Sequence, residues 1–316
     1  MKRILITGAG GFVGPHLIKE ILSQGDSDIF ATVFNSNNDL SDLVGRDHVV
    51  AGDLSDPVFA KSLLTQIKPD IIYHLAALSV VHNSADMAMR VINSNATISY
   101  NLLEAVRLSN QSARFIAICS ANVYGAVLDQ SKPLNESTPL RPLNPYAVSK
   151  VVQEMLALQY CLAHKLNIVI LRPFNHTGVG QTTDFLIPKL AKQFAAIEKG
   201  STPPIIEIGN LDSIRDFTDV RDIARAYTMA SLYCKSGETY NIGSGIGVTV
   251  ADIISIFQSL SSVKVDIKVN KNLIRHADVP FLVSDTSKFN QITNYVSTIS
   301  LKNTISDILA YWRDKS

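Results

Sequence analysis

The sequence has few of the features that mark secreted, metal-dependent or membrane-spanning proteins. Its 316 residues include only three cysteines, Cys119, Cys161 and Cys234, which lie far apart and form no Cys-x-x-Cys pair. This spacing predicts neither a disulfide framework nor a metal site, and it favours a reducing, cytoplasmic setting. Only three apolar residues separate the basic N-terminus from Thr7 and Gly8, which argues against a signal peptide. No apolar run reaches the length of about 18 residues that a membrane-spanning helix needs.

The chain also lacks an excess of either charge. Lys and Arg number 29 and Asp and Glu number 28, so the net charge is +1, and no block of like charge occurs. We therefore expect neither nucleic acid nor membrane as a partner, and an anionic ligand has to meet local cationic groups. Hydrophobic residues make up 46% of the chain and charged residues 18%, a composition typical of a globular protein with a substantial core.

Short runs rich in β-branched residues alternate with helical patterns through the first half of the chain. Expected strands cover 4–7, 29–34, 48–50, 71–75, 115–119 and 168–171. Expected helices cover 15–23, 96–108 and 146–165, the last with Asn144 as its N-cap and Pro145 in its first turn. Repeated strand and helix units predict an α/β fold with a Rossmann-type, doubly wound parallel sheet.

After Arg172 the pattern becomes mixed and is interrupted by prolines. A short strand-like run, 239–242, returns to the sheet. We predict a Rossmann domain formed by 1–172 with about 219–243, and a smaller, discontinuous C-terminal lobe formed by about 173–218 and 244–316.

A glycine-rich turn follows the first expected strand and precedes the first expected helix. Gly8, Gly11 and Gly14 form Gly-x-x-Gly-x-x-Gly, with Phe12 and Val13 inside the motif. Such a turn lets backbone N–H groups and a helix N-terminus approach a pyrophosphate closely, so it predicts a dinucleotide-binding site.

The end of the second expected strand bears on which dinucleotide binds. An NAD-binding fold places an acidic residue about 20 positions after the glycines, where it holds the ribose 2′-hydroxyl. This chain has Phe34, Asn35, Ser36, Asn37 and Asn38 there, and Asn35 is the expected contact. Without a carboxylate to repel a 2′-phosphate, NADP(H) is favoured and NAD(H) stays open, since no arginine is present to bind that phosphate.

Three polar residues form a candidate catalytic group. Tyr146 and Lys150 are four residues apart on one expected helix, so they share a face. A nearby lysine favours the phenolate and lowers the pKa of a tyrosine, which lets the phenol exchange a proton with a carbonyl or hydroxyl. Ser120 follows the fifth expected strand at the ligand-binding edge of the sheet, where it can hydrogen-bond the same oxygen or merely cap the next turn.

These motifs together resemble the extended short-chain dehydrogenase/reductases that act on nucleotide sugars. The resemblance rests on Gly8-x-x-Gly11-x-x-Gly14, Gly52-Asp53-Leu54, Leu75-Ala76-Ala77, Asn95, Ser120-Ala-Asn-Val-Tyr124-Gly125 and Tyr146-Ala-Val-Ser-Lys150. It implies further cofactor contacts from Asp53 and Leu54 at the adenine, from Leu75, Ala76 and Ala77 at the pyrophosphate, from Asn95, and from Tyr146 and Lys150 at the nicotinamide ribose. Two structural alternatives stay open: Asp53 caps the helix that starts near Pro57, and the alanines are simply packed small residues.

Motifs in the second half of the chain indicate which group within this family the chain resembles. Arg172-Pro-Phe-Asn-His-Thr-Gly-Val-Gly-Gln181 and the segment from Arg215 to Asp222 resemble the GDP-4-keto-6-deoxy-D-mannose reductases of this family. That resemblance implies substrate contacts from Asn122, Asn175, Arg215, Arg275 and Asp278, and, with weaker motif support, from Lys189, Gln181 and Phe185. A buried Arg215 paired with Asp216 or Asp219 is the structural alternative, and His176 is expected to satisfy backbone groups.

The implied reaction is NAD(P)H-dependent reduction of the C4 ketone of a GDP-linked 4-keto-6-deoxy sugar to GDP-D-rhamnose. Ala121 and Asn122 stand where related 4,6-dehydratases carry acid and base groups, so dehydration is not expected. Reduction from the other face to GDP-6-deoxy-D-talose, NAD-dependent 4-epimerisation and a non-catalytic dinucleotide sensor stay open. By the same resemblance, 96–108 and 146–165 pair with a second copy in a homodimer.

Overall fold

A parallel sheet organises the larger part of the molecule. The computed structural model describes residues 1–25, 27–35, 40–79, 85–109, 112–127, 129, 131–273 and 279–315. Seven parallel strands lie in the order β10-β6-β5-β4-β1-β2-β3. Their bounds are β1 (Lys2–Thr7), β2 (Ser27–Val33), β3 (Val49–Ala51), β4 (Ile71–His74), β5 (Arg114–Ile118), β6 (Asn167–Pro173) and β10 (Thr239–Ile242). The order reverses between β1 and β4, and ligands bind at the carboxyl ends of strands beside such a reversal.

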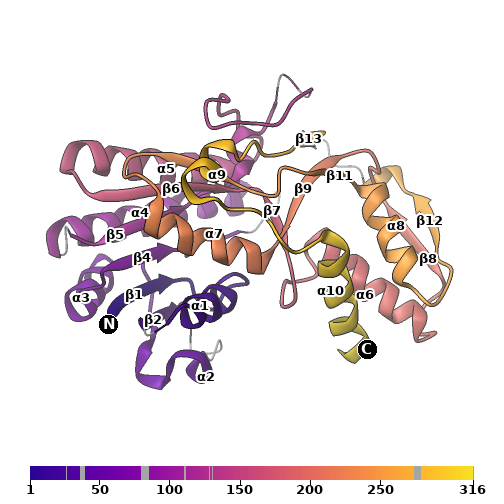
Figure 1. The fold of residues 1–316 in the computed structure, drawn as a ribbon, viewed down its shortest axis with the longest axis horizontal. Helices are drawn as coiled ribbons and strands as arrows, with labels where there is room; N and C mark the ends of the chain where they lie inside the picture. The colour runs from indigo at the N-terminus through magenta and orange to yellow at the C-terminus, as the bar shows by residue number, and fades with distance from the viewer. Residues whose placement is uncertain are drawn as a thin grey trace.

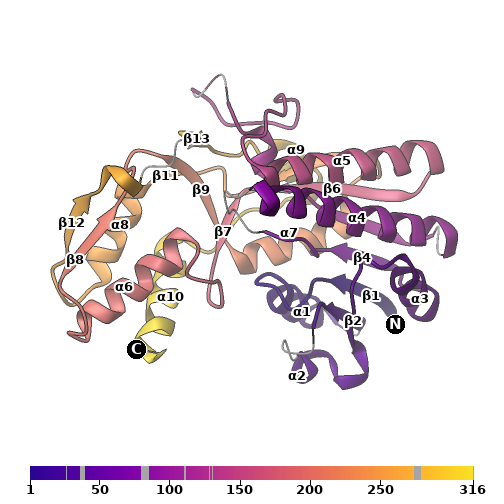
Figure 2. The same cartoon turned by 180° about the vertical axis from the view of Figure 1, so that it is seen from behind.

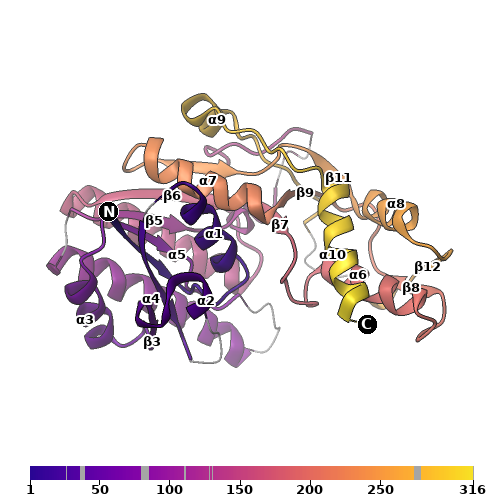
Figure 3. The same ribbon diagram turned by 60° about the horizontal axis from the view of Figure 1, so that its bottom comes forward.

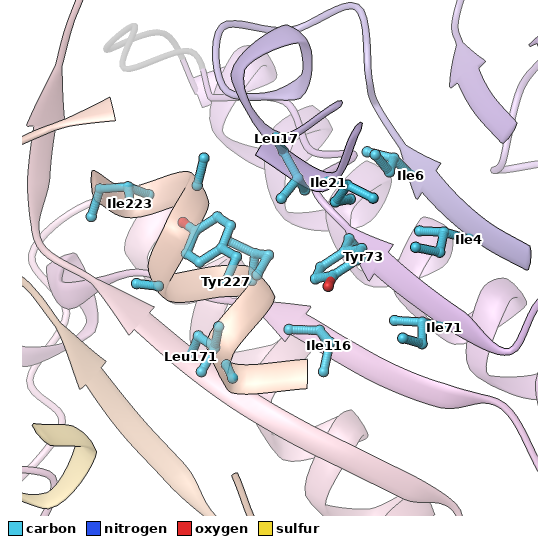
Figure 4. Packing of buried hydrophobic residues seen from close by; sticks show 14 of the residues in the cluster. Ile4, Ile6, Leu17, Ile21, Ile71, Tyr73, Ile116, Leu171, Ile223 and Tyr227 are labelled. Atoms are coloured by element: carbon cyan, nitrogen blue, oxygen red, sulfur yellow. The ribbon is translucent and has the colours of Figure 1, made fainter. Parts of the chain in front are cut away.

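Helices cover both faces of this sheet, as the predicted Rossmann-type fold requires (Figures 1 and 2). One face carries α1 (Gly14–Ser23), α2 (Ser41–Val44) and α7 (Val220–Tyr233), and the other carries α3 (Pro57–Ile67), α4 (Ala85–Ser109) and α5 (Pro145–His164). Figure 4 shows the first core layer, in which Leu17 and Ile21 of α1 and Tyr227 of α7 pack on Ile6 and Tyr73 of the sheet. The predicted α/β class is confirmed.

Local boundaries differ from the expected ones at two places that matter for function. The fifth strand ends at Ile118, so Ser120 does not end a strand but caps the short 3-10 helix η2 (Ala121–Tyr124). Helix α4 begins at Ala85 rather than at Ala96, because strong helix formers precede the polar stretch around Asn95 that obscured its pattern.

The described residues of the smaller lobe form two short sheets and three α-helices. In the first sheet, β9 (Ile214–Asp219) pairs with β7 (Asn175–Thr177), β11 (Gly247–Thr249) and β13 (Phe281–Leu282); in the second, β8 (Ile205–Ile208) pairs with β12 (Asp266–Val269). The helices α6 (Leu186–Glu198), α8 (Val250–Leu260) and α10 (Leu301–Lys315) enclose a core of their own. In Figures 1 and 3 this lobe lies beside the large sheet, and the C-terminus lies within it.

One late segment departs from the division predicted from the sequence. The sequence predicts that about 244–316 belong to the smaller lobe, yet α9 (Ser287–Thr293) lies with the larger one (Figure 3). Phe289 and Tyr295 are buried in the core layer formed by α1, α7 and the large sheet, where Phe289 also contacts the ring of Tyr240. The chain therefore returns to the Rossmann domain before it ends in α10.

Two negative findings concern the described part of the chain. None of its helices is both long enough and apolar enough to cross a bilayer. Nor do its His, Cys, Asp and Glu side chains gather anywhere in a group that could hold a metal ion.

Candidate active site

The glycine turn has the backbone shape that a pyrophosphate site requires. Gly8 has φ +65°, and a Cβ atom on it would lie 2.6 Å from the Cα of Ala76. A Cβ on Gly14 would lie 2.0 Å from the carbonyl oxygen of Ala9. Only glycine fits either position, and the turn leads directly into the N-terminus of α1. The residues present thus fit a dinucleotide phosphate, whose charge the α1 N-terminus would stabilise.

The residues predicted to meet the adenosine end lie beside this turn in the sheet order. Asn35 is exposed just after β2, and Asp53 is exposed just after β3. Asp53 does not cap α3: its carboxylate accepts from Ser55 N at 2.8 Å, and Asp56 is the N-cap, accepting from Val58 N. The structural alternative for Asp53 is therefore wrong, and Leu54 beside it is buried in the core.

The carboxyl end of β4 packs directly against the glycine turn. Ala76 N donates to Thr7 Oγ1 at 3.3 Å, and Leu75 and Ala77 flank it as partly exposed residues. Asn95 of α4 holds the next residue, Leu78, in both directions: its Oδ1 accepts from Leu78 N at 2.7 Å and its Nδ2 donates to Leu78 O at 3.1 Å. Asn95, predicted as a cofactor contact, thus shapes this loop.

Asn95 also connects the loop to the helix that carries the candidate catalytic pair. Its Nδ2 donates to Ser149 Oγ at 2.9 Å, and Ser149 Oγ donates to Tyr146 O at 2.7 Å. The predicted cap of that helix is confirmed, since Asn144 Oδ1 accepts from Ala147 N at 2.8 Å. The first turn of α5, which contains Tyr146, is therefore held by the Asn144 cap and by the hydrogen bonds from Asn95 through Ser149.

Ser120, Tyr146 and Lys150 come together at the carboxyl end of β5. Ser120 Oγ accepts from Asn122 N at 3.2 Å, which is the capping role left open from the sequence. Burial raises the pKa of Tyr146 to about 12, and the neighbouring Ser120 hydroxyl offsets part of this effect. The net direction is opposite to the lowering that the sequence predicts, because burial outweighs the effect of the Lys150 charge. A phenol of that pKa is fully protonated near neutral pH, the state a proton donor needs.

Lys150 is buried and held by two acceptors. Its Nζ donates to Ile118 O at 2.9 Å and to Gln153 Oε1 at 2.8 Å, and it lies 5.8 Å from the centre of the Tyr146 ring. Burial lowers the pKa of Lys150 to about 8, because the charged ammonium loses its hydration. The group that neighbours the phenol is therefore fixed in place and titrates near physiological pH.

The smaller lobe brings two predicted substrate residues onto one sheet. Asn175 of β7 lies opposite Phe217 of β9, and Arg215 is two residues from Phe217 on the same strand, so Asn175 and Arg215 share a face. Asn175 Oδ1 is buried and accepts no hydrogen bond from the described residues. An unpaired buried amide oxygen is costly, so this atom is suited to accept from a ligand.

The structural alternative for Arg215 assumed a buried side chain, whereas Arg215 is half-buried, and both candidate carboxylates bind other groups in the described part of the chain. Asp216 is fully buried and accepts from the backbone and side chain of Ser244 and of Ser284 and from Gly245 N. Asp219 pairs with Arg221 at 2.7 Å. Asp216, which the sequence analysis names only as a candidate partner of Arg215, fixes β9 to the loops after β10 and β13.

The remaining predicted residues have mixed placements. Lys189 is exposed in the first turn of α6, and Phe185 precedes that helix with 46% exposure. Gln181 instead bonds within the β7 turn, to Thr177 and to the His176 carbonyl. His176 itself bonds the Phe174 carbonyl through Nδ1 at 2.9 Å, as expected.

Asn122 lies in η2 directly after Ser120 and Ala121, while Arg275 and Asp278 lie outside the described residues.

Comparison with known proteins identifies the class. The family model for GDP-mannose 4,6 dehydratase matches residues 5–308, so the chain belongs to this family of extended short-chain dehydrogenase/reductases, as predicted.

Two relatives and one structure are the most informative. GDP-6-deoxy-D-mannose reductase of Pseudomonas aeruginosa is 29% identical over 99% of this chain and 98% of its own. GDP-6-deoxy-D-talose 4-dehydrogenase of Aggregatibacter actinomycetemcomitans is 34% identical over 90% of this chain and 89% of its own. The structure of RMD from Pseudomonas aeruginosa complexed with NADPH superposes with a TM-score of 0.87 at 28% identity and covers 100% of both chains.

Proposed function

We propose that this protein reduces the C4 ketone of GDP-4-keto-6-deoxy-D-mannose to GDP-6-deoxy-D-mannose, also called GDP-D-rhamnose. The observation that carries the proposal is the placement of Tyr146 beside Lys150 and Ser120 at the sheet edge next to the glycine turn. The reductase named above, similar over its whole length, supports this substrate.

A nicotinamide dinucleotide is the proposed cofactor, and when bound in reduced form it supplies the hydride. Gly8, Gly11, Phe12, Val13 and Gly14 would hold its pyrophosphate. Asn35, Asp53 and Leu54 would contact its adenosine end, and Leu75, Ala76, Ala77 and Asn95 would line its path towards Tyr146 and Lys150. The uncharged Asn35 position and the relative complexed with NADPH favour NADPH over NADH.

The proton for the product hydroxyl comes from Tyr146. The Ser120 and Tyr146 hydroxyls donate hydrogen bonds to the ketone oxygen, and as C4 accepts the hydride the phenol proton moves to that oxygen. The ammonium of Lys150 stabilises the phenolate that remains until solvent returns the proton. Asn175 and Arg215 of the smaller lobe, with Lys189, Arg275, Asp278 and Asn122, would hold the GDP-sugar so that C4 is aligned.

Dehydration, the reaction that gives the family its name, is disfavoured by the residues after Ser120. Ala121 has no titratable group, and an amide such as that of Asn122 does not exchange protons near neutral pH. Removal of a C5 proton and expulsion of water from C6 need a side chain that acts as a base and one that acts as an acid. A single hydride delivery with one proton donation does not.

A second candidate is reduction from the other face of the ketone, which gives GDP-6-deoxy-D-talose. The talose dehydrogenase named above, 34% identical, favours this alternative. Both candidates consume one reductant per sugar, so only the product distinguishes them.

The deciding experiment mixes the protein with GDP-4-keto-6-deoxy-D-mannose and either NADPH or NADH. We expect loss of reduced-nicotinamide absorbance, faster with NADPH, and GDP-D-rhamnose as the product by NMR. GDP-6-deoxy-D-talose would assign the second candidate. If neither cofactor is consumed, the reductase proposal is wrong, and tightly bound NAD in the purified protein would then point to an epimerase.

We also propose a homodimer formed through α4 and α5, which pack side by side (Figure 2). Both carry large exposed apolar side chains: Tyr100, Leu108, Met155 and Leu162. Light scattering at twice the monomer mass would support this assembly, and the monomer mass would contradict it.

A further inference from the structure

The buried amide of Gln153 makes a contact to the catalytic machinery that the proposed reaction does not by itself require. Gln153 is 1% exposed and lies three residues after Lys150, on the same face of α5. Its Oε1 accepts from Lys150 Nζ at 2.8 Å, while its Nε2 donates to Ile118 O at 3.3 Å. Because an ammonium group only donates, the amide oxygen has to face Nζ, so the orientation of this side chain is determined.

Both donors converge on one backbone carbonyl. Ile118 O accepts from Lys150 Nζ at 2.9 Å and from Gln153 Nε2, and it lies two residues before Ser120. The carbonyl, the ammonium and the amide thus form a closed triangle of hydrogen bonds beneath the candidate site. Any displacement of Nζ has to break two of its bonds at once.

The other titratable groups around Lys150 do not supply a compensating negative charge. They are Tyr146 and Glu154 on α5, Cys119 after β5, His74 on β4 and Arg172 on β6.

Burial keeps most of these groups neutral near pH 7. It raises the pKa of Tyr146 to about 12 and raises that of Cys119, and it lowers the pKa of His74 to about 3. The remaining two charges, Glu154 and Arg172, pair with each other.

We propose that Gln153 is a positioning residue of the active site, whose amide oxygen holds the Lys150 ammonium beside Tyr146 and sets the pH range in which that ammonium stays charged. This inference rests on the proposed reductase function for its catalytic consequence. A neutral amide stabilises the cation without neutralising it, so Lys150 retains its charge for the phenolate.

The first test reads Lys150 directly and needs no substrate or cofactor. The full-length protein is labelled with 13C-lysine, the Cε signal of Lys150 is assigned with the Lys150→Arg variant, and its titration is followed by NMR. Gln153→Met keeps the side-chain volume but removes the acceptor, and we expect the Lys150 pKa to fall by about one pH unit. Gln153→Glu places a carboxylate at the same position, and we expect a rise of at least the same size.

A matched control lies on the same helix. Gln159 is exposed, so Gln159→Met should leave the Lys150 titration at the wild-type value. If both Gln153 variants titrate like the wild type, or if Gln159→Met shifts Lys150 as much as Gln153→Met does, the proposal is overturned. Should Gln153→Met fail to fold, the direction of the Gln153→Glu shift decides alone.

The second test is the pH dependence of reduction. If the pKa of Lys150 falls by one unit from about 8, the charged fraction of Lys150 hardly changes at pH 6 but drops about fivefold at pH 8. We therefore expect Gln153→Met to match the wild type near pH 6 and to lose about fivefold in kcat/KM at pH 8, with the opposite change on the alkaline side for Gln153→Glu. An equal loss at every pH would indicate a merely structural role. If the wild type itself does not reduce the GDP-4-keto sugar, the proposed function fails, and the NMR titration still judges Gln153.

Discussion

The buried ion pair between Glu154 of α5 and Arg172 of β6 offers a test of how the site is anchored. Their side chains are 3% and 6% exposed, and two bonds join them, Arg172 Nε to Oε2 at 2.9 Å and Nη2 to Oε1 at 2.5 Å. The other bonds of the guanidinium go to the Tyr124 hydroxyl at 2.9 Å and the Glu136 carbonyl at 3.1 Å. In the described part of the chain, Glu154 is the one negatively charged group that hydrogen-bonds the Arg172 guanidinium, and Glu154→Gln removes that charge.

The expected cost is large because the cation stays buried. Removing one partner of a buried pair costs about 3–5 kcal/mol, against a total stability of about 5–15 kcal/mol for a typical domain. We expect urea unfolding followed by circular dichroism to show this loss as a lower midpoint.

A matched substitution at an exposed pair provides the control. Glu238 and Lys288 are 50% and 35% exposed and pair at 2.7 Å, and Glu238→Gln should cost at most about 1 kcal/mol because solvent screens the pair. The double variant with Met at 154 and 172 should recover most of the loss, since no buried charge remains. A cost below about 1 kcal/mol for Glu154→Gln would refute the reasoning.

Three further predictions concern catalysis, the glycine turn and acid stability. Tyr146→Phe should lower kcat for reduction by about 10²–10⁴-fold while fluorescence titration still detects cofactor binding, and near-normal turnover would remove Tyr146 as the acid. Gly8→Ala should weaken dinucleotide binding at least about tenfold, whereas Gly200→Ala, with φ +73° but open space around it, should leave binding unchanged; equal effects would contradict the close-approach argument. Arg313 lowers the pKa of Glu198 to about 2, so the stability that Glu198 contributes is present above its unfolded pKa of about 4.5 and is lost as the pH falls towards 2. In acid unfolding curves Arg313→Gln should flatten this dependence, and an unchanged slope would assign it to other carboxylates.

Features that depend on local sequence were predictable. The strands of the large sheet follow from β-branched runs, and the start of α5 follows from Asn144 and Pro145, because capping needs only neighbouring residues. The glycine turn was recognisable for the same reason, since its conformation is set by the glycines themselves.

Features that depend on packing between distant segments could not be predicted from the sequence. Nothing local to Phe289 or Tyr295 indicates that they complete the core of the Rossmann domain. The burial that raises the pKa of Tyr146, where the sequence predicted a lowering, arises from tertiary structure. Gln153 is an intermediate case: its three-residue spacing from Lys150 was visible, but its contact with Nζ depends on the shared carbonyl of β5.

The return of α9 to the first core has a consequence for dividing or recombining this protein. The core of the Rossmann domain draws on β1 near the start of the chain, on Tyr240 in β10 and on Phe289 and Tyr295 near its end. A fragment that stops at Arg172 would leave the apolar surface under α7, β10 and α9 exposed to water, so we expect it to aggregate. The lobe that carries Asn175 and Arg215 therefore cannot be exchanged as one continuous segment. Replacing it with the lobe of a relative to change sugar specificity would require several junctions, and the segment around 287–295 of this chain would have to be retained.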